Sequence, residues 1–162
     1  HSMAAIRYGD YIAKISVAPA STEIKALTHQ PIDTKDKPSA QRDALVEFFA
    51  KNGGEYEMRA QLCTDLEKMP VEDGSVLWEE ALSPQQVIAK LIIPAQNAYS
   101  PARRVFSDDK LSFNPWHGIA EHQPLGSIMR VRKQAYASST DFRHAMNVQP
   151  KIEPRSIDEV PE

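Results

Sequence analysis

The segment from Leu125 to Asn147 constrains this chain more than any other stretch, because its apolar helical face also carries charged side chains. A helix turns about 100° per residue, so Tyr136 lies about 40° and Arg143 about 20° from Arg132. Two arginines and a tyrosine therefore share the face that is expected to pack inward. A buried guanidinium is costly without an anion, so this face predicts an acidic partner. A tyrosine between two cations is favoured as phenolate.

Other interpretations of this face remain open. The two arginines can extend from its edge into solvent, or pair with carboxylates elsewhere in the chain. The helix can also break at Ser138–Thr140, which are weak helix formers. The same periodicity places Ile128 and Met146 on the inward face, together with Ser139.

Length and composition indicate one ordinary domain with a core of its own. The chain has 162 residues, of which 41% are hydrophobic and 25% charged. A net charge of -3 gives no support for a nucleic-acid or anionic-membrane partner. Apolar runs are all shorter than the roughly 20 residues that a membrane span needs. We therefore expect no nucleic-acid partner and no membrane.

Cys63 is the single cysteine, so no intrachain disulfide can form, and a cytoplasmic location is consistent with that. No neighbouring pattern supports Cys63 as a nucleophile, so we interpret it as a structural thiol. His117 and His122 lack the spacing and the companions of a zinc site. We expect both to be loop histidines that each make a hydrogen bond.

Apolar patterns predict three β-strands, over residues 4–18, 56–63 and 87–93. In the first, Tyr11, Ala13, Ile15 and Val17 form the apolar face; the second has one apolar and one polar face. The third is apolar on both faces except at Lys90, which predicts a central strand.

Helical periodicity and capping residues predict four helical segments, over residues 21–27, 40–51, 99–108 and 125–147. In the second, Leu45, Phe48 and Phe49 are expected to face inward. Residues 28–38, 65–84 and 113–124 are expected to be irregular connections. Residues 1–3 look like a cloning remnant, residues 4–147 form the domain, and residues 148–162 are expected to be extended or disordered.

The order of these segments resembles the latter half of the haem catalase domain. The similarity is greatest to divergent bacterial catalase-related haem proteins, in which stretches such as MPVEDGSVLW and SFNPWHGIAEHQPLGSIMRVRKQAY are characteristic. It covers residues 6–147 and is most specific over 113–143. The fold that the resemblance implies is α+β, part of a catalase-like antiparallel β-barrel with helices, whose C-terminal helix carries the haem ligand.

The resemblance also implies a ferric haem b and names its contacts. Tyr136 takes the position of the tyrosinate that binds the iron, and is thus the expected metal ligand. Arg132, four residues earlier, is expected to donate to the phenolate oxygen and tune it for catalysis. Arg143, seven residues later, is expected to meet a haem propionate.

Two departures from the family pattern are visible. Ser138 stands where catalases commonly have an aspartate, two residues after the tyrosine. The family's distal histidine, with its serine or threonine and asparagine partners, lies upstream of the region covered, and His29 does not match it. Three strands cannot close a barrel of about eight strands. The chain is therefore expected to be part of a longer protein and, without the distal acid–base group, to be nearly inactive alone.

The favoured function is a haem-dependent catalase-like or peroxidase-like oxidoreductase acting on hydrogen peroxide or an organic hydroperoxide, present here as the proximal half of the domain. Its expected protein partners are a missing N-terminal half or a second copy. The alternative is a haem-free α+β module that acts through protein contacts without catalysis. A third interpretation is an unrelated small binding domain whose motif match is accidental.

Overall fold

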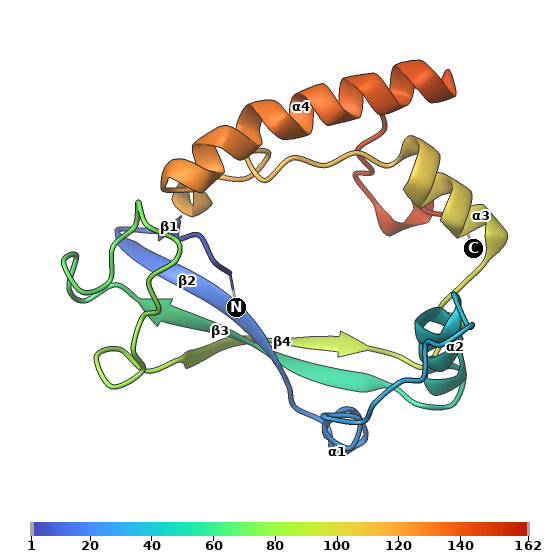
Figure 1. Cartoon of the computed structure of the whole chain (residues 1–162), viewed down its shortest axis with the longest axis horizontal. Coiled ribbons are helices and arrows are strands. Elements are labelled where there is room, and N and C mark those ends of the chain that lie inside the picture. The colour runs from blue at the N-terminus through green and yellow to red at the C-terminus, as the bar shows by residue number, and fades with distance from the viewer. Residues whose placement is uncertain (1, 162) are drawn as a thin grey trace.

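A four-stranded antiparallel sheet lies opposite one long helix in the computed structural model, which describes residues 2–161 (Figure 1). The strands pair in chain order: β1 (Ile6–Tyr8), β2 (Tyr11–Pro19), β3 (Gly54–Leu62) and β4 (Gln86–Ile93). The α+β class is as predicted. Within residues 2–161 the sheet is open and does not close into the expected barrel. His1, from the expected cloning remnant, lies outside the described residues.

The N-terminal strand predicted over residues 4–18 is a hairpin of two strands. Tyr8 pairs with Tyr11, so Gly9 and Asp10 form a two-residue turn. Gly9 has a φ of +62°, a conformation that glycine adopts without steric cost. The prediction of one continuous strand was wrong because alternation of side chains continues across such a short turn. The Gly-Asp pair, a turn-forming dipeptide, was the available signal.

The apolar face predicted for this strand is buried at one point. Ala13 is 0% exposed, whereas Tyr11 is 65% and Val17 is 49% exposed. The prediction for these two side chains was wrong, because the core covers only one end of the sheet.

β3 confirms the second predicted strand and begins two residues earlier. Ala60 and Gln61, on opposite faces, are both buried. The Gln61 side chain donates to the carbonyls of Trp78 at 3.0 Å and Ser83 at 2.9 Å. The polar face of β3 is therefore covered here by the connection to β4, with its amide group hydrogen-bonded.

β4 confirms the third predicted strand but lies at the edge of the sheet, so the predicted central position was wrong. Val87 is 55%, Leu91 41% and Ile92 68% exposed. A continuous apolar run is typical of a strand covered on both faces. Apolar composition carries no information on which chain segment lies beside a strand, and within residues 2–161 no strand pairs with its outer edge.

The predicted helical segments are confirmed, and the inward face predicted for α2 needs correction. The helices are α1 (Thr22–Lys25), α2 (Ala40–Lys51), α3 (Pro101–Val105) and α4 (Ser127–Asn147), with a π-helical turn η1 (Phe106–Lys110) and 3-10 turns η2 (Ala120–His122) and η3 (Ile157–Glu159). On α2, Phe49 is buried and Phe48 half-buried, but Leu45 is 54% exposed. The Ser100 hydroxyl caps α3 by accepting from the Arg103 amide at 3.1 Å.

The hydrophobic core lies at the end of the sheet beneath the connection from β3 to β4. Ala5, Met69 and Trp78 form its buried cluster, and Ile12, Cys63 and Val71 pack against them. The Cys63 thiol donates to the Met69 carbonyl at 3.5 Å, and burial raises the pKa of Cys63. The thiol form is thus favoured, which agrees with a structural role for this cysteine.

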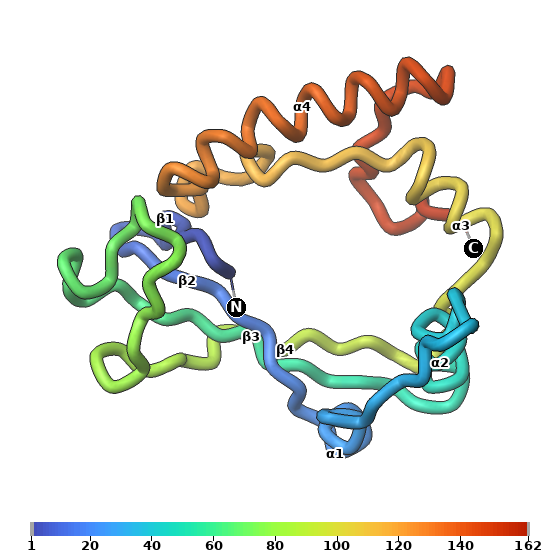
Figure 2. The backbone as a smooth tube through the Cα atoms, viewed as in Figure 1, coloured from blue at the N-terminus to red at the C-terminus, as the bar shows by residue number. Residues whose placement is uncertain are grey.

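α4 is attached to this core at its first turn (Figures 1 and 2). Residues 121–125 run antiparallel to β1, with backbone bonds from Arg7 to Gln123 at 2.8 Å and from Leu125 to Ala5 at 3.0 Å. Gly126 then begins the helix in a conformation with φ 87° and ψ 168°. This region is essentially restricted to glycine. No helix within residues 2–161 is long and apolar enough to cross a membrane.

Gly126→Ala is expected to destabilise the chain strongly. A Cβ there would lie 2.4 Å from the Val71 carbonyl oxygen, and the backbone conformation alone disfavours a side chain by about 1–3 kcal/mol. Chemical denaturation measures the loss. Gly118→Ala is the matched control, because its Cβ would meet nothing within 4 Å. Equal stability of the two variants would contradict the close approach of Gly126 to Val71.

Glu72→Gln is expected to weaken the docking of α4 in a pH-dependent way. Arg130 donates to both Glu72 oxygens, at 2.9 and 2.7 Å, and these hydrogen bonds lower the pKa of Glu72 from its ordinary value of 4.5. The wild type is therefore expected to be more stable than Glu72→Gln above pH 4.5. This difference in stability disappears as the pH falls through the lowered pKa of Glu72. Thermal unfolding against pH measures the difference, with Glu67→Gln, in the same connection, as the control variant.

Candidate functional site

One face of α4 carries the three residues predicted for the site. Arg132, Tyr136 and Arg143 are all half-buried, and the helix continues without a break through Ser138–Thr140. The structure thus places the three side chains on a common, partly covered face. Ile128 and Met146, predicted for the same face, are 38% and 66% exposed and Ser139 is exposed, so that part of the prediction was wrong.

Arg132 and Tyr136 form a direct pair one helical turn apart. The Arg132 Nη2 donates to the Tyr136 hydroxyl oxygen, and the guanidinium carbon lies 4.8 Å from the centre of the Tyr136 ring. The ring of Phe113 packs edge-on against Tyr136, with ring centres 5.7 Å apart. The phenol oxygen therefore sits beside a fixed positive charge, which stabilises negative charge on that oxygen.

Behind this pair, Met129 and Trp116 form contacts that sequence reasoning missed. The other terminal nitrogen of Arg132, Nη1, donates to the Met129 sulfur at 3.6 Å. Trp116, which is half-buried, donates its indole N–H to the Met129 carbonyl at 2.7 Å. The sequence held one signal: Met129 is three residues before Arg132, the spacing of neighbours on a helix.

Arg143 binds backbone rather than a carboxylate. Its Nη1 donates to the carbonyls of Ser107 at 3.5 Å and Asp108 at 2.9 Å, and its Nη2 donates to Leu111 at 2.5 Å. These carbonyls lie in and just after η1, where a helical segment ends and leaves acceptors without partners. The expected contact of Arg143 with a propionate stays a prediction, and both terminal nitrogens already have protein acceptors.

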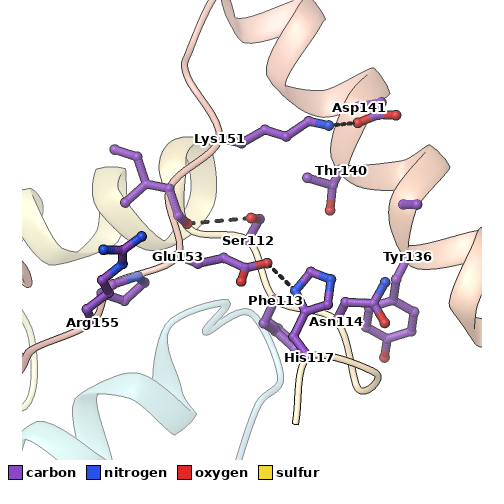
Figure 3. A pocket seen from close by; sticks show the side chains of 13 residues that line it. Ser112, Phe113, Asn114, His117, Tyr136, Thr140, Asp141, Lys151, Glu153 and Arg155 are labelled. Carbon is purple, nitrogen blue, oxygen red and sulfur yellow. Dashed lines mark hydrogen bonds and ion pairs between the residues drawn. The ribbon is translucent and has the colours of Figure 1, made fainter.

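Tyr136 lies between two cavities on the covered side of α4. One has a volume of about 790 Å³ and the other about 460 Å³, and both are lined by Phe113, Tyr136 and Thr140. Figure 3 shows the larger one, with Phe113, Asn114 and His117 gathered near Tyr136. Figure 2 shows the segment between η1 and η2, which carries these three residues, running along α4.

The C-terminal segment forms the far wall of the larger cavity. Ile152 bridges to Leu111 in parallel, and its carbonyl accepts from the Ser112 amide at 2.9 Å. Lys151 pairs with Asp141 of α4 (Figure 3). The C-terminal segment and α4 therefore line the larger cavity from two sides.

The two histidines near this segment are both held in loops. The His117 Nδ1 lies 2.7 Å from a Glu153 oxygen, which confirms the expectation of a hydrogen-bonded loop histidine. His122, in η2, stacks on Tyr8 with ring centres 5.9 Å apart. For the His122 side chain the structure records this stacking, and its backbone amide donates to the Ile119 carbonyl at 3.0 Å.

His144 is a buried residue that sequence reasoning missed. It is 4% exposed, and among the described residues neither ring nitrogen has a hydrogen-bond partner. Its neighbour Arg143 was selected from spacing to Tyr136, but nothing in the helical pattern marks His144 as buried. Its burial depends on what packs against the last turns of α4.

Tyr136 offers one donor atom of a kind that haem iron accepts, its phenol oxygen. Residues 2–161 contain no group of three or more His, Cys, Asp or Glu side chains placed to hold a metal ion. Tyr136 lines both cavities, so there is space beside its side chain.

Comparison with known proteins relates this fold to catalases. No protein-family model and no curated protein matches the sequence. The structure of catalase A from Saccharomyces cerevisiae matches with a TM-score of 0.64 and 16% identity, over 87% of this chain and 30% of the catalase. A fungal catalase matches with a TM-score of 0.64 and 14% identity, over 98% of this chain and 36% of the catalase. The chain has a catalase-like fold and spans about a third of the length of these structures.

Arg143→Met is expected to destabilise the contact between α4 and η1 by about 1–3 kcal/mol, because it leaves backbone carbonyls without their charged donor. Chemical denaturation and amide hydrogen exchange over residues 106–112 measure the effect. Arg104→Met is the control, since Arg104 makes an exposed ion pair with Asp108 on the same segment, a type that contributes about 1 kcal/mol or less. Equal losses in both variants would contradict an anchoring role for Arg143.

Proposed function

We propose that this chain is the tyrosine-bearing, proximal part of a haem-binding catalase-like or peroxidase-like oxidoreductase that acts on hydrogen peroxide or an organic hydroperoxide. The observation that carries the proposal is the hydrogen bond from Arg132 to Tyr136, whose side chain lines a cavity in a chain of catalase-like fold. Bound there, ferric haem b would supply a redox-active iron, and Tyr136 would be its axial ligand.

Arg132 and Tyr136 act as one unit in this proposal. The guanidinium donates to the phenol oxygen and stabilises its anionic form, which is the form that binds a ferric ion. An anionic oxygen ligand favours the higher oxidation states of iron. Arg132 is therefore proposed as the residue that tunes the reaction, without direct contact with peroxide.

Phe113 and Thr140 complete the pocket around Tyr136. The Phe113 ring holds the Tyr136 ring edge-on, which limits the orientations that the phenol can take. Both residues line both cavities, so they adjoin any planar group that occupies the space beside Tyr136.

Catalysis by the whole protein needs more than this chain. We propose that further strands of a longer protein complete a barrel with β1–β4, and that a distal acid–base group comes from that part or from a partner protein. A second copy of the chain is the other partner we propose. A cytoplasmic location accords with the lone, partly buried Cys63.

A haem-free module acting through protein contacts is the second candidate. The observation that favours it is β4, an apolar edge strand with Val87, Leu91 and Ile92 exposed. An open apolar edge is a template for pairing with another chain. Colour separates the two candidates, because a tyrosinate-ligated ferric haem protein absorbs visible light and a haem-free module does not.

Titration of the chain with ferric haem is expected to give a Soret band with tyrosinate charge-transfer features, and Tyr136→Phe should lose those features. Absorption spectroscopy measures both. Tyr11→Phe is the matched control, because Tyr11 is a 65% exposed tyrosine on β2. Unchanged spectra in Tyr136→Phe would overturn the ligand assignment. Absence of uptake by the wild-type chain would overturn haem binding by this chain alone and favour the haem-free module.

A further inference from the structure

Arg132 is oriented by a group that carries no charge. Its Nη2 donates to the Tyr136 oxygen, and its Nη1 donates to the Met129 sulfur at 3.6 Å. A guanidinium is planar and rigid, so a contact at one terminal nitrogen sets the direction of the other. The two contacts together define the orientation of the Arg132 guanidinium group.

Met129 is itself held firmly in place. Its side chain is 6% exposed, and its carbonyl accepts from the Trp116 indole at 2.7 Å. Lys133, one turn further along α4, lies 4.9 Å above the Trp116 ring, which adds a second contact between the indole and the helix. The burial of the Met129 side chain limits the rotamers that its sulfur can adopt.

The choice of a thioether has an electrostatic consequence. Within residues 2–161 no carboxylate lies within ion-pair distance of Arg132, whereas its neighbour Arg130 is paired with Glu72. A carboxylate in the place of the sulfur would offset the guanidinium charge. A neutral, weakly accepting sulfur orients the guanidinium and leaves its charge available to the phenol oxygen.

We propose that Met129 is a positioning residue that orients the Arg132 guanidinium toward Tyr136 while leaving its positive charge uncompensated. The proposal rests on the proposed function for its catalytic meaning, but its geometry does not. Met129 acts through Arg132 and needs no contact with haem or peroxide.

The test is a nuclear magnetic resonance measurement on the haem-free full chain. Rotation of the Arg132 guanidinium about its Cζ bonds is expected to be slow in the wild type, so the two terminal nitrogens give separate signals. Met129→Leu keeps the side-chain volume and removes the acceptor, and should speed rotation about threefold to tenfold, as expected for loss of one hydrogen bond. Met129→Gln supplies another uncharged acceptor and should restore slow rotation. Arg132→Lys identifies the signals.

Arg130 is the internal control in the same samples. It is held by both oxygens of Glu72, so its signals should stay separate in all Met129 variants and show that the helix is still folded and docked. Averaged Arg132 signals in the wild type would overturn the proposal, and so would unchanged separate signals in Met129→Leu. Because this readout needs no haem, a failure of haem uptake would leave it standing, and its own failure would leave the ligand assignment of Tyr136 untouched.

Discussion

The docking of α4 at its first turn is the constraint on which the candidate site depends. Gly126 passes so close to the Val71 carbonyl that no side chain fits, and Arg130 and Glu72 form a two-fold hydrogen-bonded pair just beyond it. Residues 121–125 add backbone bonds to β1. The rest of α4 lies apart from β3 and β4 (Figure 1). One end of the helix is therefore tied to the core, and its direction determines where Tyr136 lies.

Two guanidinium groups lie on a partly covered face of α4, where loss of water costs free energy. Hydrogen bonds to neutral acceptors offset that desolvation cost. Arg132 donates to a phenol oxygen and a thioether, and Arg143 donates to three backbone carbonyls. Within residues 2–161, neither guanidinium forms an ion pair with the carboxylate that the sequence led us to expect. Uncharged acceptors satisfy the hydrogen-bond donors of both guanidinium groups and leave their charges in place.

The two sides of the candidate site differ in how they are built. On one side, the segment from Leu111 to His117 packs directly along α4 through Phe113 and Trp116. On the other, polar contacts of Lys151, Ile152 and Glu153 hold the C-terminal segment. The outer edge of β4 adds a third surface, on which Val87, Leu91 and Ile92 are exposed. The chain spans about a third of the length of the two catalase structures it matches.

Local sequence by itself determined most helices and strands and the common face of Arg132, Tyr136 and Arg143, because side-chain periodicity and capping act over a few neighbouring residues. It did not determine the hairpin at Gly9, since alternation continues through a two-residue turn. Tertiary structure alone decided that β4 is an edge strand, that His144 is buried, and that Met129 and Trp116 support Arg132. These depend on which distant segments meet, and one helix or strand pattern contains no information on its neighbours.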